Sequence, residues 1–149
     1  TQKLKMTGAV IVTTPQDMAL ADVRKGADMF TKVNTPVLGV IENMSGLSIN
    51  GSLSELNKDT KLEVNGKNIE ISKEGKFNVV LDLFKKGGGE IESKRLDVPL
   101  LGKIPILERI MLATDDGVPI TAQETDSSSK NFYTRITENL LIQIDFQSK

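Results

Sequence analysis

The chain has 149 residues, of which 38% are hydrophobic, and its 19 basic and 20 acidic residues give a formal net charge of −1. This length suits one ordinary domain with a sizeable core, and the balanced charge gives no electrostatic basis for binding nucleic acid or an anionic membrane. The sequence contains no cysteine and no histidine. Disulfides, thiolate nucleophiles, imidazole bases and the usual zinc or iron–sulfur ligands are therefore excluded for these residues. With no long apolar run and no signal-peptide pattern, a cytoplasmic protein is expected.

The first 41 residues predict a strand, a helix and a second strand. Residues 9–12 form an apolar, β-branched run that is typical of a strand covered on both faces. Thr14 is the expected helix cap and Pro15 the expected first helical residue. A helix of about five turns follows, with Leu20, Val23, Ala27 and Phe30 on its apolar face. Residues 37–41 form the second apolar strand, so the unit is expected to have parallel strands and a right-handed crossover.

An insertion with a different pattern follows. Asn65-Gly66 lies between alternating runs at 62–64 and 69–71 and is a strong signal for a hairpin turn. A further alternating run covers residues 77–83. We predict a three-stranded antiparallel meander over about residues 52–82, inserted into a parallel α/β domain.

The remainder returns to α/β patterning. Gly87–Gly89 leads into a helix over residues 90–96, and residues 98–104 form a third parallel-type strand closed by Pro105. A helical turn at 107–113 and an extended piece at 118–120 precede a final helix from about Ser127. Its expected apolar face carries Phe132, Tyr133, Ile136, Leu140 and Ile144. The pattern predicts a single α/β domain over residues 1–149, with a parallel sheet and the inserted meander.

Ligands of open parallel sheets bind beyond the carboxyl ends of the strands, and three segments end strands at that edge: residues 13–16, 42–44 and 104–106. The carboxamide of Asn43 can read a purine edge, although its spacing alone favours a local turn. Gln16, Asp17 and Asp22 could face a phosphate or its magnesium, but as cap and surface residues they need no such role.

Two other groups carry weaker signals. Gly87–Gly89, preceded by Lys85 and Lys86, lacks the G-x-x-x-x-G-K-[ST] pattern of a phosphate loop, so a turn that opens a helix is favoured. Asp115-Asp116 and the carboxylates of Glu90 and Glu92 fit solvated helix ends, because no nucleophile and base accompany them. No catalytic or metal-binding residue is assigned.

Four sequence segments together give a family resemblance. Thr13-Thr-Pro-Gln-Asp17, Ala19-Leu-Ala-Asp-Val-Arg-Lys-Gly26, Glu42-Asn-Met-Ser45 and Val98-Pro-Leu-Leu-Gly-Lys-Ile-Pro105 together resemble the Mrp-type iron–sulfur carrier ATPases, a branch of the MinD and ParA group of P-loop NTPases. The resemblance implies ATP as cofactor, with magnesium in the full-length protein, and adenine contacts from Asn43 and Pro105. It also places Pro15 and Gln16 at the nucleotide. A homodimer and apo iron–sulfur recipients are the implied partners.

The chain departs from the family pattern in three places. The phosphate-binding loop and an acidic motif that precede this region in the family are absent. The resemblance therefore implies a C-terminal half, a partial α/β domain with a partial doubly wound parallel sheet, that does not hydrolyse ATP alone. Leu47–Gly51 stands where the family has a Cys-x-x-Cys pair, so no thiolate is available for a cluster, and Leu107 replaces an Asp. The leading hypothesis is an ATP-binding iron–sulfur carrier or assembly factor. The alternative is a degenerate scaffold that binds a protein partner through the meander.

Overall fold

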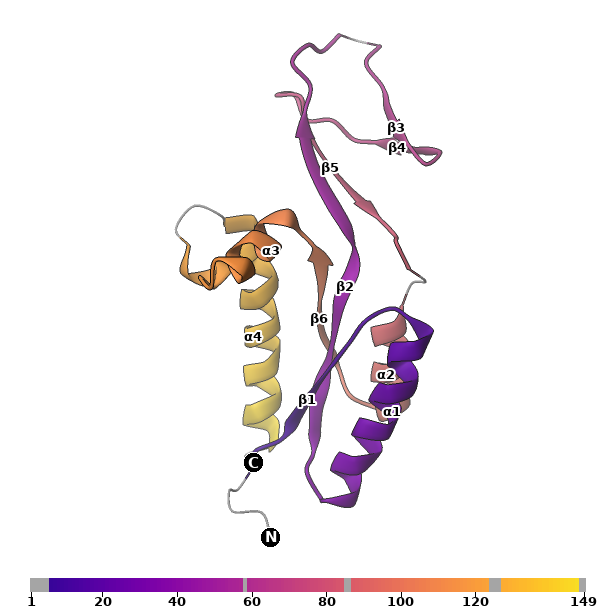
Figure 1. Ribbon diagram of the computed structural model, residues 1–149, viewed down its shortest axis with the longest axis vertical. Coiled ribbons are helices and arrows are strands. Elements are labelled where there is room, and N and C mark those ends of the chain that lie inside the picture. Colours follow the sequence, from indigo (N-terminus) through magenta and orange to yellow (C-terminus); the bar gives the residue numbers. More distant parts are fainter. Residues whose placement is uncertain (1–5, 58, 85–86, 124–126, 148–149) are drawn as a thin grey trace.

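The computed structural model describes residues 6–57, 59–84, 87–123 and 127–147. Figure 1 shows a sheet with helices on both faces and a β-ribbon that projects beyond them. Along the chain the elements are β1 Ala9–Thr13, α1 Asp17–Lys32, β2 Val37–Ser52, β3 Leu62–Val64, β4 Lys67–Ile69, β5 Lys76–Leu81, α2 Gly88–Leu96, β6 Leu100–Ile106, α3 Glu108–Asp115, η1 Ile120–Ala122 and α4 Ser127–Gln147.

The predicted parallel unit is confirmed. β1 runs parallel to β2, with Val12 paired to Ile41, and β6 runs parallel to β2 on its other side, with Ile41 paired to Gly102. The prediction that β1 is covered on both faces is wrong, because the side chain of Val12 is 57% exposed. Among the described strands β1 pairs with β2 alone, so it is an edge strand with one open side.

Helix α1 begins later than the sequence pattern predicts. Its N-cap is Gln16, which has extended backbone, and no side chain caps the helix. Thr14 is therefore not the cap, and its Oγ1 is buried without a hydrogen-bond partner in the described structure. The cause is tertiary: Pro15 packs against Gly88, where an added Cβ would lie 2.9 Å from the Pro15 Cα. The chain must pass α2 before it can turn into a helix.

The insertion is antiparallel as predicted, but its strands pair differently. β2 continues to Ser52, and β5 pairs with this extension, with Ile49 opposite Val79. β3 and β4 form a separate two-stranded sheet around the Asn65-Gly66 turn. The predicted three-stranded meander is therefore wrong, because the extended β2 offers β5 a long row of backbone partners that the three-residue β4 cannot match.

The helices form one layer on each face of the sheet. Figure 1 shows α1 and α2 on one side and α4, with α3 near its start, on the other. Ala27 of α1 packs with Ile11 and Val40 of the sheet to form the buried centre on this side. On the opposite face Ile136 of α4 sits on Gly102 of β6, where a Cβ would lie 2.5 Å from its Cγ1. None of the described helices combines the length and apolarity that crossing a bilayer requires.

Candidate functional site

The three predicted strand-end segments meet at one edge of the sheet. Thr13 pairs with Glu42, and Asn43 pairs with Ile104, which places the ends of β1 and β6 beside residues 42–43. The predicted strand end at residues 42–44 is wrong, because β2 continues to Ser52. Pro105 lies inside β6 and does not close it, since the strand continues to Ile106. A proline, which has no N–H group, is tolerated at such an irregular edge position.

Asn43 makes a local turn contact. Its Oδ1 accepts a hydrogen bond of 3.0 Å from the backbone N–H of Met44, whose φ of 54° lies in the left-handed region. The carboxamide thus stabilises an unfavourable backbone conformation where the parallel register of β2 with β6 is interrupted, between Asn43 and Leu47. Its Nδ2 has no acceptor among the described residues, so this group can still donate to a ligand.

Glu42 is the buried centre of the edge. Its side chain is 2% exposed, and its Oε2 accepts a 2.6 Å hydrogen bond from the backbone N–H of Gly89. Lys103 Nζ lies 3.6 Å from Glu42 Oε1 and donates to Glu90 Oε1 at 2.8 Å. The hydrogen bond to Glu90, with the charge of Glu42, raises the pKa of Lys103. The same lysine lowers the pKa of Glu90.

The glycine-rich turn opens α2, and the N-terminus of this helix contacts a carboxylate of the protein. Gly87 is the N-cap with a φ of 81°, a conformation that favours glycine. Gly89 packs so closely on Glu42 that a Cβ would lie 2.7 Å from the glutamate Cβ. The Glu42 carboxylate already occupies the place at the helix N-terminus that an anion would take. The sequence-based preference for a turn over a phosphate loop therefore agrees with the geometry.

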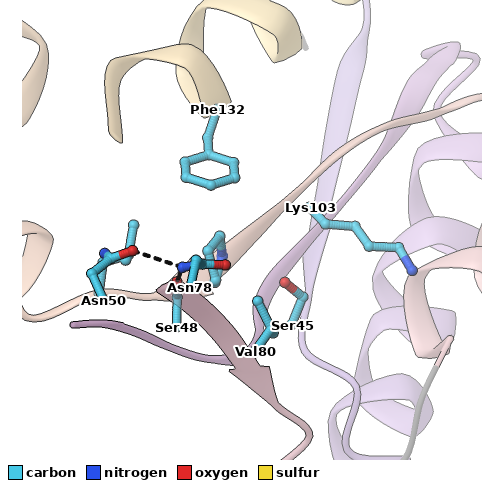
Figure 2. Close-up of a pocket in the computed structure, with 9 residues that line it drawn as sticks. Ser45, Ser48, Asn50, Asn78, Val80, Lys103 and Phe132 are labelled. Carbon is cyan, nitrogen blue, oxygen red and sulfur yellow. Dashed lines mark hydrogen bonds between the residues drawn. The ribbon is translucent and has the colours of Figure 1, made fainter. Parts of the chain in front are cut away.

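A cavity of about 520 Å³ adjoins this edge. It lies between the β2–β5 ribbon, β6 and the start of α4, and its lining includes Ser48, Asn50, Asn78, Pro105, Leu107 and Phe132. Figure 2 shows the Phe132 ring facing the polar side chains of the ribbon. Asn78 Nδ2 donates to Ser48 Oγ at 2.9 Å and to Asn50 Oδ1 at 2.8 Å.

Of the predicted site residues, Pro105 lines this cavity, whereas Asn43, Pro15 and Gln16 are not among the described residues of its wall. Sequence reasoning missed Ser48, Asn50 and Asn78. Polar residues alternate at 48 and 50, and this period of two is the signal that could have extended β2 and placed both side chains on one face.

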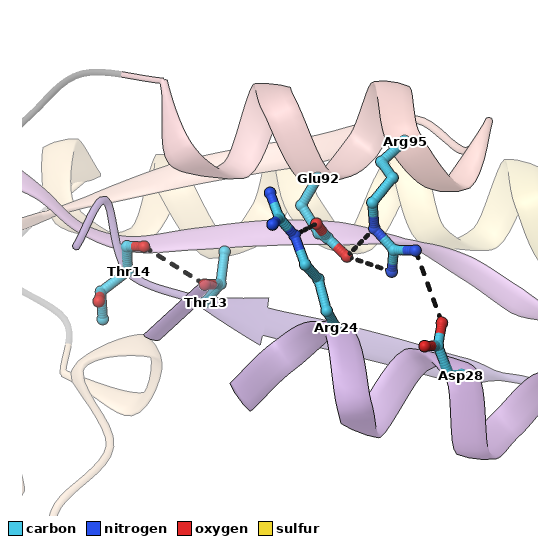
Figure 3. A network of polar contacts seen from close by, with 6 residues as sticks. All are labelled: Thr13, Thr14, Arg24, Asp28, Glu92 and Arg95. Atoms are coloured by element: carbon cyan, nitrogen blue, oxygen red, sulfur yellow. Dashed lines mark hydrogen bonds and ion pairs between the residues drawn. The ribbon is translucent and has the colours of Figure 1, made fainter. Parts of the chain in front are cut away.

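The remaining acidic candidates serve other contacts. Glu90 is half-exposed, whereas Glu92 is fully buried and binds Arg95 and Arg24, as Figure 3 shows. The two carboxylates therefore face different surroundings and form no catalytic pair. Asp22 pairs with Lys25 on the surface of α1. The described residues contain no group of three or more acidic side chains that could hold a metal ion.

Comparison with known proteins identifies the family of this chain. The model of the ParA family, described as the NUBPL iron-transfer P-loop NTPase, matches residues 1–62 and 54–141. The chain belongs to this ParA family. A solved relative in fold is the cell division ATPase MinD of Pyrococcus furiosus, which aligns with a TM-score of 0.56 and 19% identity over 91% of this chain and 43% of MinD. The predicted fold class, part of a P-loop NTPase sheet with an antiparallel insertion, is confirmed.

Curated relatives of this ParA-family chain are named as iron–sulfur cluster transfer or carrier proteins. The iron–sulfur cluster transfer protein NUBPL of Dictyostelium discoideum is 33% identical over 97% of this chain and 37% of its own length. The iron–sulfur cluster carrier protein of Synechocystis is 37% identical over 94% of this chain and 33% of its own length. The chain thus spans about a third of the length of these relatives.

Proposed function

We propose that this ParA-family chain forms the base-side part of an ATP site in an iron–sulfur cluster carrier or transfer protein. The proposal is supported by the family, by the names of the relatives and by the edge formed by β1, β2 and β6. The observation that carries it is the register of β2 with β6, in which Asn43 pairs with Ile104, the residue before Pro105, so that the two proposed adenine contacts lie on neighbouring strands.

The residues present fit the base end of a nucleotide. The cavity beside Pro105 has a volume within the range of small-molecule sites, about 300–1,000 Å³. Pro105 is buried and gives the cavity an apolar wall, and the Nδ2 group of Asn43 remains able to donate. Pro15 and Gln16, at the end of β1, are proposed to lie toward the phosphates.

The same residues do not fit the triphosphate. The Gly87–Gly89 N-terminus is capped by Glu42, and Lys103 is held by two carboxylates. The G-x-x-x-x-G-K-[ST] pattern does not occur in the 149 residues. In this proposal the phosphates and their magnesium are bound by residues outside the 149-residue chain. Bound ATP would supply phosphoryl chemistry there, while this chain binds and orients the base.

The iron–sulfur cluster is cargo in this proposal. Without cysteine, residues 1–149 supply no thiolate. In this proposal the cluster ligands come from residues outside these 149, in one or both subunits of the proposed homodimer, or from the apo iron–sulfur recipient.

Equilibrium binding of a fluorescent ATP analogue by the complete gene product, with and without magnesium, tests the nucleotide site. We expect binding that weakens about five- to thirtyfold in Asn43→Ala, the change for one lost hydrogen bond. Asn68→Ala, in the exposed β4, is the matched control and should bind as the wild type does. Absence of any nucleotide binding would contradict the proposal and favour the non-catalytic scaffold.

Transfer of cargo is tested separately. The complete protein, reconstituted anaerobically with iron and sulfide, should pass its cluster to an apo iron–sulfur protein, followed by visible absorption and circular dichroism. A protein that binds ATP but never acquires a cluster would overturn the carrier role and leave the nucleotide site intact.

A further inference from the structure

The wall of the cavity that faces Phe132 is made by the insertion. Ser48 and Asn50 of β2 and Asn78 of β5 lie on one face of the ribbon, because Asn50 and Asn78 are paired across the strands. Figure 2 shows these side chains beneath the ring of Phe132, which comes from α4. A planar group entering the cavity would therefore meet an aromatic face and a row of amide and hydroxyl groups.

An irregularity in β2 brings this polar row close to the strand-end edge. Asn43 pairs with Ile104 and Leu47 pairs with Ile106, so four steps along β2 correspond to two along β6. At about 3.3 Å per residue, the intervening segment advances about 7 Å, where a regular strand would advance about 13 Å. Ser48, the residue after Leu47, therefore lies beside the end of β6, and it shares the cavity with Pro105.

The hydrogen bonds within the row leave a defined pattern for a ligand. Asn78 uses both hydrogens of Nδ2, one toward Ser48 Oγ and one toward Asn50 Oδ1. Its Oδ1 remains an acceptor, and Asn50 Nδ2 remains a donor, with no partner for either among the described residues. Because the two carboxamides bond head to tail, the free acceptor and the free donor lie at opposite ends of this pair, as Figure 2 shows. The Asn78 Oδ1 is therefore a single free acceptor in the cavity wall, and the exocyclic amino group of adenine is a donor that suits it.

We propose that Asn78 of the insertion recognises the amino group of the nucleotide base through its free Oδ1 while Phe132 stacks on the face of the base. This inference rests on the proposed ATP site and adds to it a second wall, opposite the strand-end contacts. Asn78 is the specificity-determining residue, because its Oδ1 accepts from the 6-amino group. Phe132 binds any planar base, since every base offers a face for stacking.

The test compares two ligands on the complete gene product: ATP and purine riboside triphosphate, which lacks the 6-amino group. The wild type should bind ATP about five- to thirtyfold more tightly. Asn78→Ala should lose this preference by weakening ATP binding alone. Phe132→Leu should weaken the binding of both ligands by a similar factor and keep the preference for ATP. Asn68→Ala is the control for both, and thermal unfolding confirms that each variant folds.

The outcomes separate the two proposals. If the wild type prefers ATP and Asn78→Ala keeps that preference, the inference is wrong while the ATP site stands. Equal affinity of the wild type for both ligands also overturns it. If the wild type binds neither ligand, the proposed function and this inference fail together.

Discussion

At the scale of single residues, the contact between α1 and α2 depends on a buried charge. Glu92 has no exposed surface, and its Oε1 accepts from Arg95 Nε at 2.9 Å and Nη2 at 2.6 Å. Arg24 Nε of α1 lies 3.6 Å from Oε2, and Arg95 also reaches Asp28 (Figure 3). A carboxylate in this position is tolerated because it is paired, and it costs stability when a partner is removed.

Arg95→Met should therefore destabilise the protein by about 2–4 kcal/mol, because it leaves Glu92 buried with Arg24 as its remaining cation. The free energy of unfolding from urea titration measures this. Lys94→Met, the exposed neighbour on the same helix, is the control and should change stability by less than about 0.5 kcal/mol. Equal effects of the two variants would show that the ion pair between Glu92 and Arg95 contributes nothing to the free energy of unfolding.

The Lys103–Glu90 pair predicts a pH dependence. The pKa of Glu90 is lowered from its ordinary 4.5. Its contribution to the stability of the folded protein is therefore complete above pH 4.5 and is lost as pH falls through the lowered value. The pKa of Lys103 is raised from 10.5. Its contribution to stability is therefore complete below pH 10.5 and is lost as pH rises through the raised value. Both contributions coexist between these limits.

Glu90→Gln should thus reduce the acid-side loss of stability and leave the slope between pH 6 and 9 unchanged. Unfolding free energies measured across pH 2–9 for variant and wild type provide the comparison. Because Glu90 is exposed, the effect should shrink in high salt. Parallel curves for the two proteins at low pH would contradict the assignment.

At the scale of elements, local patterns predicted most helices and strands and the parallel pairing of β1 with β2, but not the partner of β5. The apolar run at 37–41 identifies β2, yet the strand continues for eleven residues because β5 supplies an antiparallel partner from about 30 positions away. Such long-range pairing leaves little local signal. For the same reason the strand-end rule could predict that Asn43 and Pro105 lie on neighbouring strands, whereas the Asn78 side of the cavity could not be foreseen.

Alanine substitutions at two glycines in different helices should change the stability of the protein in opposite directions. A Cβ at Gly26 of α1 would meet nothing within 4 Å, so Gly26→Ala should stabilise the protein by about 0.5–1 kcal/mol through helix propensity. A Cβ at Gly89 of α2 would lie 2.7 Å from Glu42 Cβ, so Gly89→Ala should destabilise it by about 1–3 kcal/mol. Thermal unfolding of both variants is the measurement. Stabilisation by both would mean that α2 can move away from Glu42 at no cost.

At the scale of the whole molecule, the sheet has an open side. β1 pairs with β2 alone among the described strands, and Val12 on it is largely exposed. The chain also spans about a third of the length of its curated relatives. An uncovered edge with exposed apolar side chains is a template for pairing with another chain. This edge, more than the exposed helix surfaces, should therefore govern how the 149-residue chain behaves in isolation.

The isolated 149-residue chain should self-associate through β1, and Val12→Lys should weaken this association about tenfold, because a lysine on an edge strand opposes strand addition. Ile91→Lys removes a similarly exposed apolar side chain, 52% exposed, from helix α2 and is the matched control. Sedimentation velocity over a range of concentrations distinguishes the two. If both variants weaken association equally, general apolar contact is responsible, and if the wild type stays monomeric, the β1 edge is already protected. The difference between Val12→Lys and Ile91→Lys therefore isolates the contribution of backbone pairing from that of exposed apolar surface.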